Sequence, residues 1–186
     1  MISTPLLERA LMRHGGLFAL AGWSGSGKTT LAEKLIVELT ARGLNMATIK
    51  HAHHNFEADI EGKDSYRHRK AGAAQVLVSS AKRAALFSEH DIEPSLAELV
   101  ERLAPADIVL VEGFKTEPMP KLEIWRAEVG KPTLYPHDPH ILALASDRPV
   151  ADCTLPQLRL DDVATIADFV LANRWTGGAL AVGSGQ

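Results

Sequence analysis

Short apolar runs alternate with stretches of helical periodicity along this chain. Residues 17–21 (Leu-Phe-Ala-Leu-Ala) are apolar throughout, and residues 107–111 (Asp-Ile-Val-Leu-Val) are apolar after the first position. Both runs are typical of strands that are buried on both faces. Residues 30–39 place apolar side chains at helical spacing, which predicts an amphipathic helix. Strands that alternate with helices favour an α/β fold of three layers, in which helices cover both faces of a mainly parallel sheet.

The same patterns predict the other elements. Strands are expected over 45–50, 75–79, 84–87, 122–126 and 141–145, and helices over 63–74, 94–103 and 161–172. Residues 51–62 are polar and irregular, so they are expected to form a loop. The pattern shows no linker, and we expect one domain over 1–175 followed by a flexible tail over 176–186.

The loop after the first strand carries the strongest chemical signal. Residues 22–29 (Gly-Trp-Ser-Gly-Ser-Gly-Lys-Thr) match the phosphate-binding pattern G-x-x-x-x-G-K-[ST] at every fixed position. Glycines let successive N–H groups face the phosphates, and the following helix directs its positive dipole end at them. Lys28 reaches the β- and γ-phosphates, and the Thr29 hydroxyl binds Mg²⁺. The sequence predicts a P-loop NTPase-like fold whose nucleotide site comprises Gly22, Trp23, Ser24, Gly25, Ser26, Gly27, Lys28, Thr29 and Thr30.

Acidic residues at the ends of later strands complete the expected site. Glu112 follows the apolar run 107–111, where a carboxylate supports the Mg²⁺ shell or orients a water molecule. Asp107 is the rival acid, although it is expected at the opposite edge of the sheet. Asp147 follows the strand 141–145, where P-loop GTPases place a carboxylate that binds guanine. No Asn-Lys-x-Asp motif accompanies it, so an ordinary turn is the competing interpretation.

A histidine-rich loop and a basic helix follow the strand 45–50. Asp59, in the same loop, is a candidate for the Mg²⁺ shell or for a bound water, with a surface acid as the alternative. Three histidines in four positions are compatible with zinc or nickel, although neighbouring positions of an extended segment point opposite ways. The competing hypothesis is a substrate or anion site beside the phosphate loop. Its expected members are Lys50, His51, His53, His54, Lys63, Asp64, Arg67 and Arg69.

Composition excludes several classes of protein. The net charge of −3 gives no reason to expect nucleic acid or an anionic membrane as the partner. Cys153 is the single cysteine, so no intrachain disulfide forms and a reducing compartment fits. No apolar stretch reaches the roughly 18 residues that a membrane span needs, and residues 1–16 lack the core of a signal peptide. The expected location is the cytoplasm.

Taken together, these motifs resemble the molybdopterin-guanine dinucleotide biosynthesis protein B family (MobB). The resemblance runs from about residue 17 to residue 147. One departure is Glu61, where the family pattern has proline before Gly-Lys-Asp. The matching segments are 22–30 (GWSGSGKTT), 49–54 (IKHAHH), 62–65 (GKDS), 69–74 (RKAGAA) and 110–115 (LVEGFK).

The resemblance implies a GTP-binding protein with weak GTPase activity. Its catalytic groups would be Lys28, Glu112 and Asp59, with Mg²⁺ held by Thr29 and Glu112. It would assist the guanylyltransferase MobA, which attaches GMP to molybdopterin, and would meet molybdopterin or its guanine dinucleotide. The resemblance further implies a homodimer held by strands outside the nucleotide core, for which 84–87 and 122–126 are the candidates.

Three alternatives stay open from the residues alone. A small-molecule kinase would use the same phosphate loop, but the sequence shows no clear lid segment. A metal-delivery GTPase would use His51, His53 and His54. A non-enzymatic adaptor would use nucleotide only to set its conformation.

Overall fold

The computed structural model describes residues 4–52 and 56–177, and the chain divides into two compact units. Unit 1 comprises residues 1–51 and 96–186, and unit 2 comprises residues 52–95. Unit 2 is thus inserted within unit 1 along the chain. The sequence predicted one domain over 1–175 and did not indicate these two units. The expected tail falls almost entirely on residues outside the described part. No helix of the described residues is long and apolar enough to cross a membrane.

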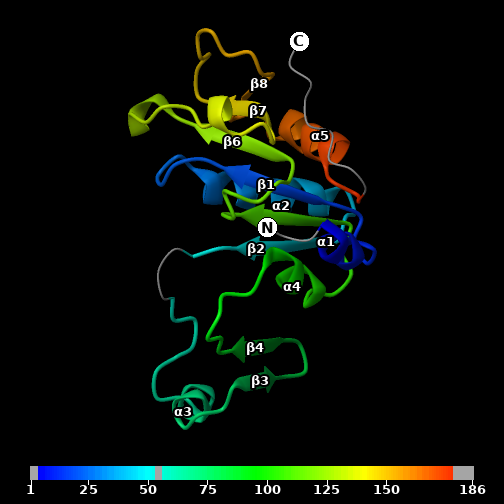
Figure 1. The fold of residues 1–186 in the computed structure, drawn as a ribbon, viewed down its shortest axis with the longest axis vertical. Helices are drawn as coiled ribbons and strands as arrows, with labels where there is room; N and C mark the ends of the chain where they lie inside the picture. Colours follow the sequence, from blue (N-terminus) through cyan, green and yellow to red (C-terminus); the bar gives the residue numbers. More distant parts are fainter. Residues whose placement is uncertain (1–3, 53–55, 178–186) are drawn as a thin grey trace. The chain divides into compact units, whose positions relative to one another are not determined.

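A six-stranded sheet in the order β2-β5-β1-β6-β7-β8 forms the centre of unit 1 (Figure 1). Every neighbouring pair of its strands is parallel, as the sequence pattern predicted. The carboxyl ends of all six strands therefore lie at one edge of the sheet. The strands are β1 (Leu17–Ala21), β2 (Met46–Lys50), β5 (Ile108–Glu112), β6 (Lys121–Trp125), β7 (Ile141–Ser146) and β8 (Gln157–Arg159).

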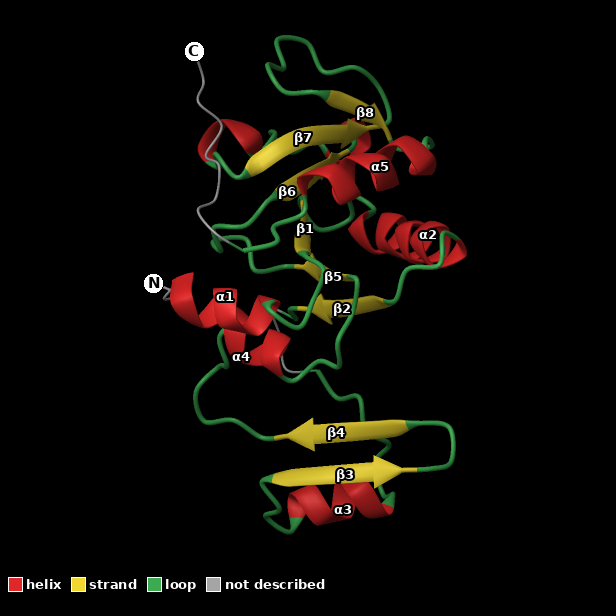
Figure 2. Cartoon of the chain, turned by 90° about the vertical axis from the view of Figure 1, so that its right-hand side faces the viewer, coloured by secondary structure: helices red, strands yellow, loops and turns green. Residues whose placement is uncertain are grey.

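Helices cover both faces of this sheet (Figure 2). On one face lie α2 (Lys28–Ala41) and α5 (Val163–Asn173), and on the other lie α1 (Thr4–Leu11) and α4 (Leu96–Glu101). Alternate residues of β1 serve the two faces: Phe18 and Leu20 pack with α2 and α5, whereas Leu17 and Ala19 pack with α1 and α4. This arrangement explains why β1 is apolar at every position. Two short 3₁₀ turns, η1 (Ala127–Val129) and η2 (Tyr135–His137), lie between β6 and β7.

One predicted strand lies in an unexpected place. Residues 122–126 were expected outside the nucleotide core, but β6 pairs with both β1 and β7 inside the main sheet. That prediction was wrong because Lys121 and Glu123, which suggest a half-exposed strand, are both buried with partners. Lys121 Nζ lies 2.6 Å from Asp138 Oδ2, and the Glu123 carboxylate accepts from two backbone N–H groups. The pattern also missed α1 and β8.

Unit 2 is built from a helix and a hairpin. The hairpin consists of β3 (Gln75–Ser79) and β4 (Ala84–Ser88), which pair antiparallel and supply the extra strands that were expected. The helix α3 (Asp64–Lys70) contacts β3. It is shorter than the predicted helix over 63–74, because the chain turns at Ala71 and Gly72. Gly72 has φ +104°, which does not continue a helix.

Candidate functional site

The phosphate loop joins β1 to α2 at the carboxyl edge of the sheet. Two of its glycines are required by close approach as well as by backbone conformation. A Cβ at Gly22 (φ +142°) would lie 2.5 Å from the carbonyl oxygen of Ile124, and one at Gly27 (φ +93°) would lie 3.2 Å from Arg126 Nε. Gly27 directly precedes α2, so the first N–H groups of α2, which have no partner within the helix, lie at the loop. The motif thus has the strand, loop and helix that phosphate binding needs.

Lys28 lies folded over this loop. Its ammonium donates to the carbonyl oxygens of Gly22 (2.9 Å) and Trp23 (2.8 Å). Burial lowers the pKa of Lys28 from its ordinary value, while the charge of Glu112 acts in the opposite direction. The nearby ammonium groups of Lys115 and Lys50 lower the pKa further. The mouth of the loop is therefore a concentration of positive charge, which suits a polyanion.

A carboxylate and a hydroxyl meet beside the loop. Thr29 Oγ1 donates to Glu112 Oε1 at 3.0 Å and to Oε2 at 3.2 Å. Lys50 Nζ lies 3.9 Å from Glu112 Oε2, because the parallel register places the ends of β2 and β5 opposite each other. A hydroxyl and a carboxylate are hard oxygen donors of the kind that Mg²⁺ prefers. These residues fit the expected magnesium site.

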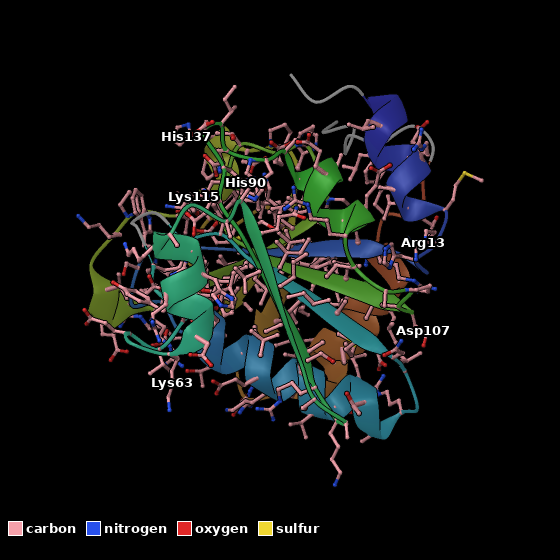
Figure 3. The ribbon with its side chains drawn as sticks, turned by 90° about the horizontal axis from the view of Figure 1, so that it is seen from below. Arg13, Lys63, His90, Asp107, Lys115 and His137 are labelled. Atoms are coloured by element: carbon pink, nitrogen blue, oxygen red, sulfur yellow. The ribbon has the colours of Figure 1, made fainter. Side chains whose placement is uncertain are left out.

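The rival acid lies at the other edge of the sheet. Asp107 precedes β5, and its Oδ2 accepts from the backbone N–H of Asn45 at 2.7 Å. Figure 3 shows Asp107 and Lys115, which come before and after β5, at opposite ends of the sheet. Asp107 therefore holds a loop of the scaffold, and Glu112 is the acid at the phosphate loop.

A cavity of about 640 Å³ opens beyond the phosphate loop on the side of β7 and β8. Asp147, the candidate guanine contact, lies directly after β7 and lines this cavity. Arg126 lines the same cavity, and its Nε donates to the carbonyl oxygen of Ser26 in the phosphate loop at 3.2 Å. Sequence reasoning missed Arg126, because its strand was assigned outside the nucleotide core.

Trp23 ties the phosphate loop to two other segments. Its indole N–H donates to the carbonyl oxygen of Pro132 at 2.7 Å. The ammonium groups of Lys115 and Lys131 lie 5.5 and 5.9 Å from the centre of the indole. Both distances allow a cation–π interaction. Lys131 was not among the residues predicted for the site from the sequence.

The turn after β5 brings Lys115 to this position. Gly113 has φ +101°, and Phe114 has φ +49°, a conformation that is uncommon for residues other than glycine. The ring of Phe114 stacks on His51, with 4.7 Å between the ring centres. This contact joins His51, which follows β2, to the turn after β5.

In unit 2, Arg69 is surrounded by carboxylates. It contacts Glu57 at 2.8 Å, Asp59 at 3.3 Å and Glu89 at 2.7 Å. Asp59 also accepts from Ser65 Oγ at 2.8 Å. All of these contacts of Arg69 and Asp59 are with other residues of unit 2.

Other expected members of the histidine and basic segments are less constrained. Lys63, Asp64 and Arg67 lie at or within α3, where Arg67 makes only a long ion pair of 3.9 Å with Asp64 among the described contacts. His53 and His54 lie outside the described residues. Within the described part, no group of three or more His, Cys, Asp or Glu side chains is arranged to hold a metal ion.

Comparisons with known proteins show which family the chain resembles. The family model described as "Molybdopterin guanine dinucleotide synthesis protein B" matches residues 17–147. The chain is 45% identical over 157 residues to a molybdopterin-guanine dinucleotide biosynthesis adapter protein of Haemophilus influenzae, covering 83% of this chain and 86% of that protein. It is also 45% identical over 160 residues to the adapter protein of Escherichia coli, covering 83% and 91%.

Solved structures show the same fold. The crystal structure of MobB from Bacillus subtilis matches with a TM-score of 0.67 at 28% identity, covering 86% of this chain and 98% of that one. The phosphate loop, Glu112 and Asp147 all lie inside the segment that the family model matches. The resemblance of the sequence motifs is thereby confirmed, and the chain belongs to the molybdopterin guanine dinucleotide synthesis protein B (MobB) family.

Proposed function

We propose that this protein binds GTP with Mg²⁺, hydrolyses it slowly, and acts as an adapter in the conversion of molybdopterin to its guanine dinucleotide. The observation that carries the proposal is the pairing of Thr29 with Glu112 at the start of α2, directly after a complete phosphate loop. Relatives that are 45% identical to this chain are molybdopterin-guanine dinucleotide biosynthesis adapter proteins, which supports the pathway. The guanylyltransferase MobA is the proposed partner.

The edge of the sheet provides a place for each part of the nucleotide. The loop N–H groups and Lys28 would bind the phosphates, and Thr29 with Glu112 would hold Mg²⁺. The ion would supply charge neutralisation at the reacting phosphate. Asp147 would accept from the guanine ring in the cavity of about 640 Å³, a volume that accommodates a base.

Slow hydrolysis follows from the groups at the loop. Lys28 supplies positive charge, but the glutamine that lines the cavity at this edge, Gln157, has its side-chain amide bonded to the backbone of Val150. Of the two arginines considered as an arginine finger, Arg69 already contacts three carboxylates, whereas Arg67 makes one long ion pair among the described contacts. We expect turnover on the order of 10⁻⁴ to 10⁻² s⁻¹ without the partner.

The proposed assembly is a homodimer. Leu77, Val78 and Leu86 on the β3–β4 hairpin of unit 2 are exposed by 67%, 44% and 54%. Apolar side chains gathered on a two-stranded hairpin favour association with another chain. The test is the mass in solution by light scattering, where a monomer in the wild type would contradict the assembly.

The first experiment is calorimetric binding of GTP and ATP with Mg²⁺ to the wild type and to Lys28→Ala. We expect tighter binding of GTP than of ATP, and loss of most affinity for both in Lys28→Ala. Lys82→Ala, which removes an exposed lysine from unit 2, is the control and should bind as the wild type does. A preference for ATP would contradict the GTP assignment and favour a small-molecule kinase.

A further inference from the structure

Arg126 occupies a position that the established motifs do not explain. It directly follows β6, the strand between β1 and β7, so it lies between the phosphate loop and Asp147 at the same sheet edge. Its Nε donates to the Ser26 carbonyl oxygen at 3.2 Å, and its guanidinium lies over Gly27, where an added Cβ would be 3.2 Å from Nε. The side chain also lines the cavity of about 640 Å³ that contains Asp147.

The order of the strands shows which half of a nucleotide Arg126 would meet. Glu112, the acid of the proposed magnesium site, is the last residue of β5, on one side of β1. Arg126 follows β6 on the other side, toward β7 and Asp147. A nucleotide laid along this edge has its terminal phosphate toward Glu112 and its base toward Asp147. Arg126 therefore lies on the side of the phosphate loop that faces Asp147, where the nucleoside would bind.

The environment of Arg126 leaves its flat guanidinium available for a ligand. Among the described contacts, its carboxylate partner is Glu128 at 3.9 Å, a long ion pair to a side chain that is 73% exposed. One nitrogen is fixed on the phosphate loop, and about a third of the side chain is exposed. An arginine held at one nitrogen keeps a planar surface of the kind that stacks on aromatic rings.

We propose that Arg126 binds the nucleoside half of the nucleotide, with its guanidinium plane packed on the purine ring. This inference rests on the proposed nucleotide site and adds to it the residue that joins the phosphate half to the base half. Because stacking does not read the exocyclic groups of a purine, Arg126 contributes affinity for the base, and Asp147 contributes the choice of guanine.

The test is calorimetric binding of three Mg²⁺-loaded probes: GTP, inosine triphosphate and inorganic tripolyphosphate, which has no nucleoside. In Arg126→Ala, the affinities for GTP and inosine triphosphate should fall by the same factor, about tenfold. The affinity for tripolyphosphate should stay within about twofold of the wild type. Arg126→Lys keeps the charge but lacks the plane, and it should recover only part of the lost affinity.

Arg174→Ala is the matched control. Arg174 also lies over a glycine (Gly16) and donates from Nε to a loop carbonyl oxygen (Gly15, 2.9 Å), but it does so at the start of β1, away from the cavity. It should leave all three affinities unchanged. An equal loss of GTP and tripolyphosphate binding in Arg126→Ala would overturn the inference, as would an unchanged affinity for GTP. If the wild type bound tripolyphosphate but no nucleotide, the proposed function would fail as well.

Discussion

Thr29 connects the phosphate loop to Glu112, and its hydroxyl is the protein group best placed to bind Mg²⁺. We predict that Thr29→Ala removes the dependence of GTP affinity on Mg²⁺. The wild type should bind GTP at least tenfold more tightly with Mg²⁺ than with a chelator, and the variant should bind about equally in both. Thr40→Ala, an exposed threonine of the same helix, is the control. A full Mg²⁺ effect in Thr29→Ala would contradict the assignment.

Glu123 is a buried carboxylate whose ionisation affects stability. Its oxygens accept from the backbone N–H groups of Leu134 (2.7 Å) and Tyr135 (2.9 Å), which lie at the start of η2. Burial raises the pKa of Glu123 above the ordinary value of 4.5, although these two N–H groups act to lower it. In Glu123→Gln one of the two N–H groups faces an amide NH₂ instead of an oxygen, and we expect a loss of about 1–3 kcal/mol in the free energy of unfolding.

The sign of the pH dependence follows from the raised pKa. Between pH 4.5 and the raised value, the folded state binds more protons than the unfolded chain, so the contribution of Glu123 to stability falls as the pH rises. The difference in unfolding free energy between the wild type and Glu123→Gln should therefore narrow across this window. Urea denaturation at a series of pH values measures it, and a difference that widened with pH would show that the pKa is lowered instead.

At the scale of elements, the turn after β5 depends on one glycine, Gly113. In Gly113→Ala the new Cβ would lie 2.6 Å from the Cβ of His51, and the residue would keep φ +101°. We expect the free energy of unfolding to fall by about 2–3 kcal/mol or more. Gly130→Ala is the matched control, because φ is +65° there but nothing lies within 4 Å of the added atom.

The Gly130 control separates backbone strain from steric clash. It should cost about 1–2 kcal/mol, the penalty for a left-handed residue with a Cβ. Thermal or urea unfolding of both variants gives the comparison. Equal losses would mean that the contact between residue 113 and His51 is relieved by a small shift, and that the conformation alone makes glycine necessary.

Most elements of unit 1 were predictable because their sequence signals are local. β1 and β5 are apolar at nearly every position, and the phosphate motif marks the start of α2 without reference to the rest of the chain. The position of β6 was not predictable. Its two charged residues are buried by partners at residues 134, 135 and 138, and such long-range bonds leave no trace in the periodicity of a short strand.

The candidate site divides in the same way. Lys28, Thr29 and Glu112 were predicted from a motif and from the end of an apolar strand, and the structure brings them together. Arg126 and Lys131 could not be predicted as site residues. Both come next to the phosphate loop because β6 pairs with β1, and the sequence does not indicate that pairing. The expected catalytic role of Asp59 stays a prediction, and the structure adds its bonds to Ser65 and Arg69.

At the scale of the whole molecule, the division into two units predicts that they unfold separately. Arg69, 14% exposed, connects the loop residues Glu57 and Asp59 to Glu89 after β4, and its guanidinium also lies 5.4 Å from the ring centre of Phe87. Arg69 thereby joins α3 to the loop before it and to the residues in and after β4. Removal of Arg69 leaves Asp59, whose side chain is 5% exposed, without its cation.

We therefore expect Arg69→Ala to speed hydrogen exchange at least tenfold across residues 57–89, while exchange in the sheet of unit 1 stays unchanged. Arg67→Ala is the control, because that side chain is 73% exposed and makes only a long ion pair with Asp64 among the described contacts. Hydrogen exchange followed by mass spectrometry resolves the two units. Faster exchange in β1 and β5 of the Arg69 variant would mean that the two units unfold as one, because a local loss in unit 2 would then lower the stability of every element.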